Sequence, residues 1–513
     1  MGLAKGYSGG VAGVEAFEVE IEASARSMGD PALYVVGLPD AAVRESKDRV
    51  WTAIFNSRLQ FNPCHMTVNL APADVRKEGA SFDLPIALSI LLATESVKPA
   101  ANPAAYVVLG ELALSGEVRR VRGVLPIAIM ARKKGFKGII VPNGNAEEAA
   151  VVEGLEVYGV SNLREASDFF EGKIKLDPVK VDLAKMCESQ FRGADDFSEV
   201  KGQLLARRAI EVAVSGGHGV LMIGSPGCGK SLMARRIPSI LPPMTLDEAL
   251  ETTQIHSVAG ALPAHQSLLT QRPFRAPHHT ASDVGLLGGG MHLSPGEVSL
   301  AHNGVLFLDE LPEFPRNVLE VLRQPLEDGH VTITRASGSV TFPSRFMLVA
   351  AMNPCPCGYA GDPKRECRCL PLRVQAYRDK ISGPLLDRID IHINVPAVHF
   401  QQMGSSAPAE DSAAIRARVV ASRARQTERF GPGGPVCNAH MRPRDTHKFC
   451  ALSSGCSTLL KMAMEEMGLT GRAFDRILKV SRTIADMDAS GQIREEHIQE
   501  AISYRTLDRM KWR

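Results

Sequence analysis

One eight-residue loop constrains the fold of this chain more than any other feature. It reads Gly224-Ser225-Pro226-Gly227-Cys228-Gly229-Lys230-Ser231 and matches the pattern G-x-x-x-x-G-K-[ST] at every position. Residues 219–223 before it are suited to a short buried strand, and residues 232–237 after it to the first turns of a helix. A phosphate-binding loop requires this strand–loop–helix order, so the loop predicts an α/β domain with a nucleotide at the end of one strand. The alternative is a glycine-rich turn that matches by chance.

The residue types of this loop suit phosphate chemistry. Its glycines let backbone N–H groups curl around phosphate oxygens, and the following helix adds the partial positive charge of its N-terminus. Lys230 is expected to reach the β- and γ-phosphates, and the Ser231 hydroxyl to ligate Mg²⁺. We therefore expect ATP and Mg²⁺ as cofactors.

A second motif follows the loop at a suitable distance. Four apolar residues, 305–308, predict a buried parallel strand that ends in Asp309 and Glu310. Ligands of open α/β sheets bind at that end, so Asp309 is expected to hold Mg²⁺, directly or through water, and Glu310 to act as general base. Another buried strand, 347–352, places Asn353 beside them, where its amide would help to position the attacking water. Together the motifs predict an ATPase.

The length and charge of the chain limit the number of its domains and the kinds of partner it can bind. With 513 residues it has room for two or three domains, and a net charge of +2 excludes a general polybasic coat. Any contact with nucleic acid must then be local. Neither a signal-peptide pattern nor an apolar run of about 18 residues is found, so we expect a cytoplasmic protein without a membrane contact.

Changes of pattern along the chain predict its domain organisation. We expect an N-terminal α+β domain, a weakly patterned linker, a central ATPase domain and a C-terminal helical lid. The expected borders are 1–165, 166–195, 196–400 and 401–513.

Two segments of the ATPase domain are candidates for DNA contact. Residues 272–282 combine Arg272 and Arg275 with two histidines and two prolines, and residues 285–290 add four glycines. This composition predicts a loop, and we consider a substrate-facing pore loop, plain packing, and a His-His metal site. A predicted hairpin over residues 331–342 carries Arg335 near its tip, as either a phosphate contact or a solvated side chain.

Four cysteines stand close together after the strand that ends at Asn353. They form two C-x-C pairs, Cys355 with Cys357 and Cys367 with Cys369, on either side of a polar loop. Paired thiols at such a spacing suit tetrahedral Zn²⁺ as a structural staple. Free thiols or a redox pair are the alternative.

The first 165 residues resemble the proteolytic domain of Lon-type proteases. The segment 77–81, ending in Ser81, stands at the family's nucleophile loop, and the segment 123–127 precedes the position of its catalytic lysine. That position is Ala131 here. A Ser–Lys mechanism requires an amine within reach of the hydroxyl, so we expect a scaffold or interaction role for the domain and not a peptidase.

The order of motifs as a whole resembles the AAA+ superfamily, in particular its magnesium-chelatase and MCM-helicase branch. The features that carry this resemblance are the inserted hairpins, the displaced helical lid and the segment 384–390, Pro-Leu-Leu-Asp-Arg-Ile-Asp. With the Lon-like domain and the segment Asn-Pro-Cys-Pro-Cys-Gly, the chain is similar to the YifB/ComM family of bacterial magnesium-chelatase-like ATPases. In such a ring Arg388 would reach the γ-phosphate of the neighbouring subunit, unless it forms a salt bridge with Asp387 or Asp390. Arg472 would contact the γ-phosphate of its own chain.

The resemblance also implies a function. It suggests a homohexamer that binds single-stranded and branched DNA and drives branch migration in natural transformation and recombination, with recombination proteins as further partners. A chelatase-type ATPase that remodels another protein is the alternative, and an ATP-dependent protease is disfavoured by Ala131.

Overall fold

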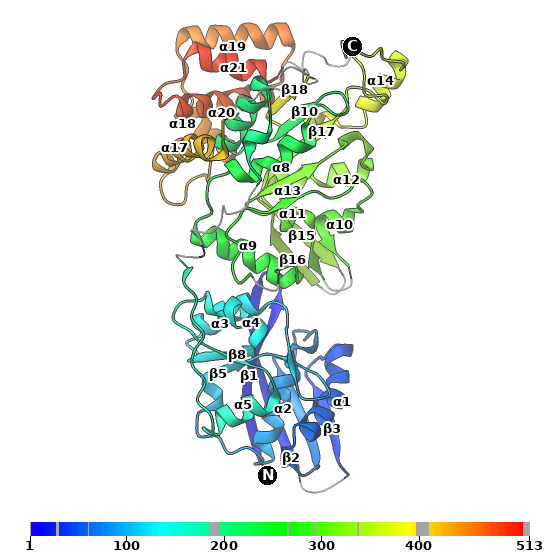
Figure 1. Ribbon diagram of the computed structural model, residues 1–513, viewed down its shortest axis with the longest axis vertical. Helices are drawn as coiled ribbons and strands as arrows, with labels where there is room; N and C mark the ends of the chain where they lie inside the picture. The colour runs from blue at the N-terminus through cyan, green and yellow to red at the C-terminus, as the bar shows by residue number, and fades with distance from the viewer. Residues whose placement is uncertain are drawn as a thin grey trace.

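The computed structural model of the protein is elongated. Figure 1 shows the N-terminal domain at one end, the sheet with the phosphate-binding loop in the middle, and the C-terminal helices at the other end. The structure describes residues 2–26, 30–59, 61–183, 186, 195–263, 266–290, 293–335, 338–396 and 410–505.

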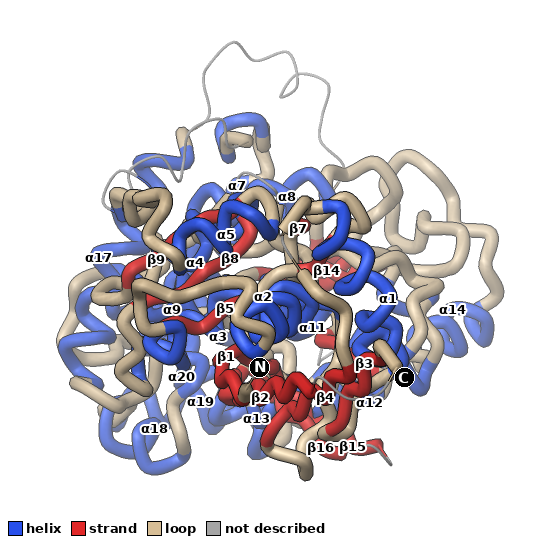
Figure 2. Tube along the Cα trace, turned by 90° about the horizontal axis from the view of Figure 1, so that it is seen from below, coloured by secondary structure: helices blue, strands red, loops and turns tan. Residues whose placement is uncertain are grey.

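The N-terminal domain is built on a seven-stranded mixed sheet in the order β3-β4-β2-β1-β5-β8-β9. Figure 2 looks at this domain from its outer end, where helix α2 lies beside β1 and β2. Nearly all residues of α2 are buried, because the helix is apolar on every side and is covered by other elements. The elements are β1 Leu3–Ala12, β2 Glu15–Arg26, β3 Ala32–Val36, α1 Ala41–Asn56, β4 His65–Ala71, α2 Asp83–Ala93, β5 Tyr106–Val108, β6 Glu111–Leu112, β7 Val118–Arg119, α3 Val124–Lys133, β8 Gly138–Pro142, α4 Asn143–Ala150, β9 Glu156–Val160 and α5 Leu163–Phe170.

Helix α5 carries the first domain beyond its expected end. The border expected after residue 165 falls inside this helix, which runs from Leu163 to Phe170. Phe170 is buried and its ring centroid lies 5.9 Å from that of Tyr106 on β5. Apolar side chains of the expected linker thus belong to the domain core, which corrects the expected border.

The central domain contains a five-stranded parallel sheet in the order β11-β14-β17-β10-β18. Its central strands are apolar on both faces, as expected for a sheet covered by helices on both sides. Because all strands are parallel, their carboxyl ends meet at one edge, called the carboxyl edge below, and their starts meet at the opposite, amino edge. The strands are β10 Val220–Ile223, β11 Phe274–Arg275, β14 Val305–Leu308, β17 Met347–Met352 and β18 Ile391–Asn394.

Helices and two small hairpins surround this sheet. The antiparallel hairpin of β15 and β16 pairs Arg335 with Gly338, as the sequence predicts for this segment. The elements are α7 Leu204–Gly216, α8 Lys230–Ile240, α9 Leu246–Ala259, α10 Asp283–Leu287, β12 Gly288–Gly289, β13 Ser294–Pro295, α11 Glu297–Leu300, α12 Arg316–Val321, α13 Arg323–Asp328, β15 His330–Arg335, β16 Gly338–Pro343, α14 Pro371–Arg378 and α15 Gly383–Leu386.

The N-terminal domain contacts the central domain at α9 and at the β15–β16 hairpin. Ser257 Oγ on α9 donates a 2.5 Å hydrogen bond to the Glu148 carboxylate, and the Ser257 carbonyl accepts one of 3.2 Å from the Gly123 N–H. A Cβ placed on Gly13, in the β1–β2 turn, would lie 2.7 Å from Val340 Cγ1 on β16. The turn therefore needs glycine there, both for this close approach and for its positive φ of 68°.

Helices form the C-terminal domain in the residues that the structure describes, and among them α17 and α20 pack against α7 and α8 of the central domain. Together with them they share one apolar core that continues to strands β10 and β18. The helices are α17 Ser412–Phe430, α18 Pro443–Phe449, α19 Ser454–Met467, α20 Gly471–Met487 and α21 Glu495–Ser503. The border expected between residues 400 and 401 lies outside the described residues. Within the part of the chain that the structure describes, no helix is both long and apolar enough to cross a membrane.

Candidate nucleotide site

The loop Gly224–Ser231 joins β10 to α8 at the carboxyl edge of the central sheet. Gly227 and Gly229 adopt positive φ angles of 77° and 94°, which glycine reaches without steric cost. Lys230 is the first residue of α8, so its ammonium and the free N–H groups of the helix start are presented at the same place. The local sequence thus produces an anion-binding cradle at the expected end of the strand.

Lys230 is held inside this loop by oxygen atoms. Its Nζ donates to the carbonyls of Gly224 at 2.6 Å and Ser225 at 3.1 Å. It also donates to Asn353 Oδ1, 3.3 Å away at the end of β17. Strand β17 lies between β10 and β14, so Asn353 reaches the loop from the neighbouring strand, and its expected role beside Asp309 and Glu310 stays a prediction.

Ser231 and Asp309 meet across the sheet edge. Ser231 Oγ donates a 2.6 Å hydrogen bond to Asp309 Oδ2. Two oxygens bound side by side to octahedral Mg²⁺ are about 2.9 Å apart, because each lies about 2.0–2.1 Å from the ion. The two side chains therefore fit a Mg²⁺ ion that they hold together with the phosphates of a nucleotide.

Glu310 stands next to Asp309 in a backbone conformation that favours glycine. Its φ is 52°, and its N–H donates to Asp309 Oδ1 at 3.0 Å. The side chain is 54% exposed, and its Oε2 lies 3.5 Å from His279 Nδ1. A strained residue at the carboxyl edge, with an accessible carboxylate, is suited to act on a water molecule beside the γ-phosphate.

His279 reaches Glu310 because strand β11 joins the sheet. β11 is only two residues long and pairs in parallel with β14, with Arg275 opposite Leu306. The chain that follows β11 then arrives at the carboxyl edge beside Glu310. Sequence patterns did not indicate this strand or the role of His279, because two residues between prolines carry no measurable periodicity.

A pocket of about 240 Å³ lies beside the loop. Apolar atoms of Val200, Leu232 and Met233 form part of its wall. Gln203 closes it by donating to the Cys228 and Pro396 carbonyls at 2.8 and 2.9 Å. The size and the mixed lining suit a nucleoside base next to phosphates bound in the loop.

Arg388 lies at the opposite edge of the same sheet. Strands β10 and β18 are parallel with Val220 opposite Ile391, so the residues just before β18 lie at the amino edge. Arg388 is paired with Glu327 of α13, and it donates to the Pro384 carbonyl at 2.6 Å. Its side chain is 7% exposed. The intrachain partner is thus Glu327 and neither Asp387 nor Asp390, which the sequence had suggested.

Arg472 also lies on the side of Arg388 and not beside the loop. Its Nη1 is 4.0 Å from Asp387 Oδ2, and Arg476, one turn further along α20, lies 3.0 Å from Asp390 Oδ1. Helix α20 therefore binds both carboxylates that flank Arg388. The sequence predicts a contact of Arg472 with the nucleotide of its own chain, whereas this arrangement places Arg472 beside Arg388.

Two of the three arginines expected at DNA are used inside the protein. Arg272 donates to the Pro242 and Asn303 carbonyls, both at 2.7 Å, and forms a 2.8 Å ion pair with Glu248. Arg275 makes a bidentate pair with Glu297, which raises the pKa of the arginine. Both side chains connect the loop to neighbouring helices, so they are not positioned to bind phosphate.

Arg335 remains a candidate for contact with nucleic acid. It is exposed at the end of β15, and the structure records no ion pair for it among the described residues. The hairpin projects toward the N-terminal domain (Figure 1).

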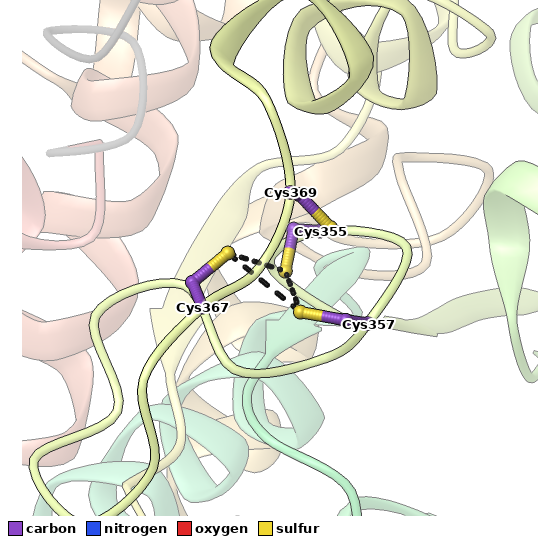
Figure 3. A group of neighbouring side chains, drawn as sticks. All are labelled: Cys355, Cys357, Cys367 and Cys369. Carbon is purple, nitrogen blue, oxygen red and sulfur yellow. Dashed lines mark hydrogen bonds between the residues drawn. The ribbon is translucent and has the colours of Figure 1, made fainter.

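The four cysteines after β17 form one cluster (Figure 3). Three Sγ–Sγ separations are 3.3, 3.6 and 3.6 Å, and all four sulfurs lie within 4.8 Å of one another. Four thiolates around tetrahedral Zn²⁺ are about 3.8 Å apart when each Zn–S bond is about 2.3 Å. The cluster therefore fits a zinc ion closely, whereas the three stated separations are too long for a disulfide and all four thiols are free.

The N-terminal domain does not place a catalytic lysine at the position of Ala131. Ala131 is fully buried in the apolar core of α3. Lys134, nearby in the sequence, forms a 2.9 Å ion pair with Glu18. The buried Lys77 donates to the Pro72 carbonyl, and burial lowers the pKa of its amine.

The fold and this site define a P-loop ATPase of the AAA+ type. A family model described as magnesium chelatase, subunit ChlI matches residues 196–403, and one for the C-terminal part of that subunit matches 409–505. A third, described as subunit ChlI of Mg-chelatase, matches residues 19–145.

Comparison with full-length relatives defines the family. The chain is 43% identical to competence protein ComM of Haemophilus influenzae, with 99% of both chains covered. It is 41% identical to YifB of Salmonella typhimurium, with 99% of this chain and 98% of the relative covered. A shorter stretch, 29% of the chain, is 32% identical to 31% of the DNA repair protein RadA of Bacillus subtilis. The chain belongs to the YifB/ComM family of magnesium-chelatase-like AAA+ ATPases.

Proposed function

We propose that this protein is an ATP-driven motor that works on DNA as a ring of six copies. The observation that carries the proposal is the separation of Lys230 and Arg388 at opposite edges of one sheet. The four residues of strand β10 separate the two edges of the sheet by about 13 Å, at about 3.3 Å per residue. An arginine that acts on the γ-phosphate must then come from another copy of the chain, so the complete site requires an assembly.

Each residue has a distinct role in this mechanism. Lys230 neutralises charge on the β- and γ-phosphates, while Ser231 and Asp309 would hold Mg²⁺, which would supply further positive charge to the phosphates. Glu310 accepts a proton from the attacking water, and Asn353 orients that water. Arg388 of the neighbouring copy leaves Glu327 and stabilises the charge that develops on the transferred phosphoryl group.

The position of Arg472 suggests that it works beside Arg388. Because α20 binds Asp387 and Asp390 on either side of Arg388, a movement of the C-terminal helices also moves this segment. We propose that both arginines act on the nucleotide of the neighbouring copy.

The proposed substrate is single-stranded and branched DNA, and the proposed task is branch migration in natural transformation and recombination. The names of two relatives support it, because one is a competence protein and the other a DNA repair protein. The exposed Arg335 at the end of β15 provides a sequence-independent phosphate contact. Recombination proteins are the expected partners, and the four-cysteine cluster is the proposed site of structural Zn²⁺.

A second function is favoured by one comparison. The family model that matches residues 19–145 is itself described as a magnesium-chelatase subunit, so the N-terminal domain does not argue against that class. In that case the protein would remodel a partner protein and would not need DNA.

One experiment separates the two functions. The ATPase rate and the movement of strands on a three-stranded DNA substrate are measured for wild type and Lys230→Ala. We expect DNA to stimulate ATP hydrolysis and strands to move with wild type only. An ATPase rate that is indifferent to DNA, without strand movement, would favour the protein-remodelling function.

A further inference from the structure

The four-cysteine loop, residues 355–369, covers the phosphate-binding loop. It begins two residues after Asn353, so it leaves β17 at the carboxyl edge. Gly358, with a φ of 85°, packs directly on Pro226, where an added Cβ would lie 2.6 Å from two ring carbons. The cluster and the nucleotide site are therefore parts of one structure.

Asp362 provides a polar connection between the two loops. Its Oδ2 accepts a 2.7 Å hydrogen bond from Ser225 Oγ, in the second position of the phosphate-binding loop. Its Oδ1 accepts from the N–H groups of Lys364 and Arg365 at 2.8 and 3.1 Å. The hydrogen bond from Ser225 is the main cause that lowers the pKa of Asp362, so the carboxylate is ionised at neutral pH.

The cysteines fix both ends of the segment that carries Asp362. Cys355 and Cys357 precede it, and Cys367 and Cys369 follow it. Within the segment, the Ala360 N–H donates to Cys355 Sγ at 3.3 Å, and Arg365 donates to the Tyr359 hydroxyl at 2.7 Å. A metal bound by the four sulfurs would join these ends and hold the carboxylate in one position.

We propose that the four-cysteine loop is a metal-dependent clamp on the phosphate-binding loop, with Asp362 as the positioning residue that holds Ser225. A glycine-rich loop loses conformational entropy when it closes on phosphate, and a clamp that fixes it beforehand reduces that cost. ATP affinity thus depends on the metal, although the cysteines do not touch the nucleotide. The inference rests on the proposed ATP site.

The test measures the binding of a fluorescent ATP analogue to the full chain, together with the zinc content of each variant. Asp362→Ala is expected to retain zinc and to bind the analogue about five- to tenfold more weakly, which lies within the range for one lost hydrogen bond of ordinary strength. Asp362→Asn, which keeps an acceptor oxygen, is expected to recover part of the loss. Glu366→Ala, an exposed carboxylate of the same loop, serves as the matched control and is expected to bind like wild type.

A double-mutant cycle tests the contact itself. Ser225→Ala and the double variant Ser225→Ala/Asp362→Ala are expected to bind as weakly as Asp362→Ala alone, since all three lack the same hydrogen bond. Additive losses would contradict the clamp. Unchanged or tighter binding by Asp362→Ala would overturn it as well, because the carboxylate would then only repel phosphate.

The metal is tested by removing two ligands. Cys367→Ser/Cys369→Ser is expected to contain no zinc and to show at least the loss seen for Asp362→Ala. Full affinity without zinc would overturn the role of the metal. Lys230→Ala tests the proposed ATP site separately from the clamp. If this variant still bound the analogue, the assignment of the ATP site would be wrong, whatever the Asp362 variants show.

Discussion

His279 Nδ1 lies 3.5 Å from Glu310 Oε2 at the carboxyl edge of the central sheet. His279 follows β11, and Arg272 before that strand and Arg275 within it are bound to neighbouring helices. The rings of His279 and Phe314 are also in contact, with centroids 6.4 Å apart. An anchored loop therefore presents a histidine to the residue that we expect to act as general base.

Replacing His279 by alanine tests whether this contact positions Glu310. We expect kcat for ATP to fall about three- to tenfold while KM changes little, since the histidine contacts the base and not the nucleotide. Glu310→Gln itself is expected to lower kcat by about 100-fold or more, the usual contribution of a general base. Steady-state ATPase kinetics measure both effects.

The neighbouring histidine offers a matched control for this prediction. His278 is exposed, its Nδ1 lies 2.9 Å from Thr280 Oγ1, and its ring packs on that of His279 with centroids 4.1 Å apart, so His278→Ala should lower kcat less than His279→Ala. Adding His279→Ala to Glu310→Gln should cause no further fall in kcat. An independent second loss would show that His279 acts elsewhere.

Mixed rings test the assignment of Arg388. Arg388→Ala alone should bind ATP and assemble but not hydrolyse it. In an equal mixture with Glu310→Gln, about one quarter of the interfaces combine an intact Glu310 with an intact neighbouring Arg388, so activity should return. ATPase assays of the mixture measure this, and a mixture of Arg388→Ala with Arg388→Ala/Glu310→Gln is the control that cannot recover. If the first mixture remained as inactive as this control, an arginine acting between copies would be refuted.

The same design decides on which nucleotide Arg472 acts. If Arg472 serves the neighbouring copy, mixing Arg472→Ala with Glu310→Gln restores activity, as for Arg388. If it serves its own chain, every interface with an intact Glu310 lacks the arginine, and the mixture remains inactive. From the 4.0 Å distance between Arg472 and Asp387 we expect recovery.

Metal analysis tests the cysteine cluster. Purified protein should contain about one zinc per chain, because four thiolates at these separations satisfy one tetrahedral ion. Release of the zinc by a thiol-blocking mercurial, followed with a colorimetric chelator, should require modification of the cluster. Absence of zinc from protein prepared without chelators would leave the thiols with a redox role.

Much of the nucleotide site follows from local sequence and one rule of topology. The loop around Lys230, the carboxylates after β14 and Asn353 after β17 each follow a short apolar strand. Parallel strands bring their ends to one edge, so the proximity of these residues is predictable without coordinates.

The partners of the arginines were not predictable in this way. Arg388 pairs with Glu327, 61 residues earlier, and Arg272 is enclosed by Asn303 and Glu248 from other elements. Such contacts depend on how helices pack on the sheet, which leaves no periodic signal in the arginine's own segment. For the same reason the pattern alone suggested DNA contacts for Arg272 and Arg275.

Asp390 connects the segment of Arg388 to the C-terminal helices, and its charge should stabilise that connection. Its carboxylate is 2% exposed and lies 2.7 Å from His218 Nδ1 and 3.0 Å from Arg476 Nη1. Burial acts to raise its pKa, but the charge of Arg476 and the hydrogen bond from His218 outweigh burial and hold the pKa well below the usual range. Because the pKa is lower in the folded state, the stabilisation is complete above about pH 4 and is lost as the pH falls further.

Asp390→Asn should therefore lower Tm by several degrees at pH 7, since removing one member of a buried pair costs about 3 kcal/mol. The difference from wild type should be the same at pH 5 and should shrink below about pH 4, which thermal unfolding followed by circular dichroism can measure. Asp387→Asn is the matched control on the same segment, because Asp387 is 24% exposed and lies 4.0 Å from Arg472. An equal loss of Tm in both variants would mean that the segment, and not the buried charge, determines the stability of this contact.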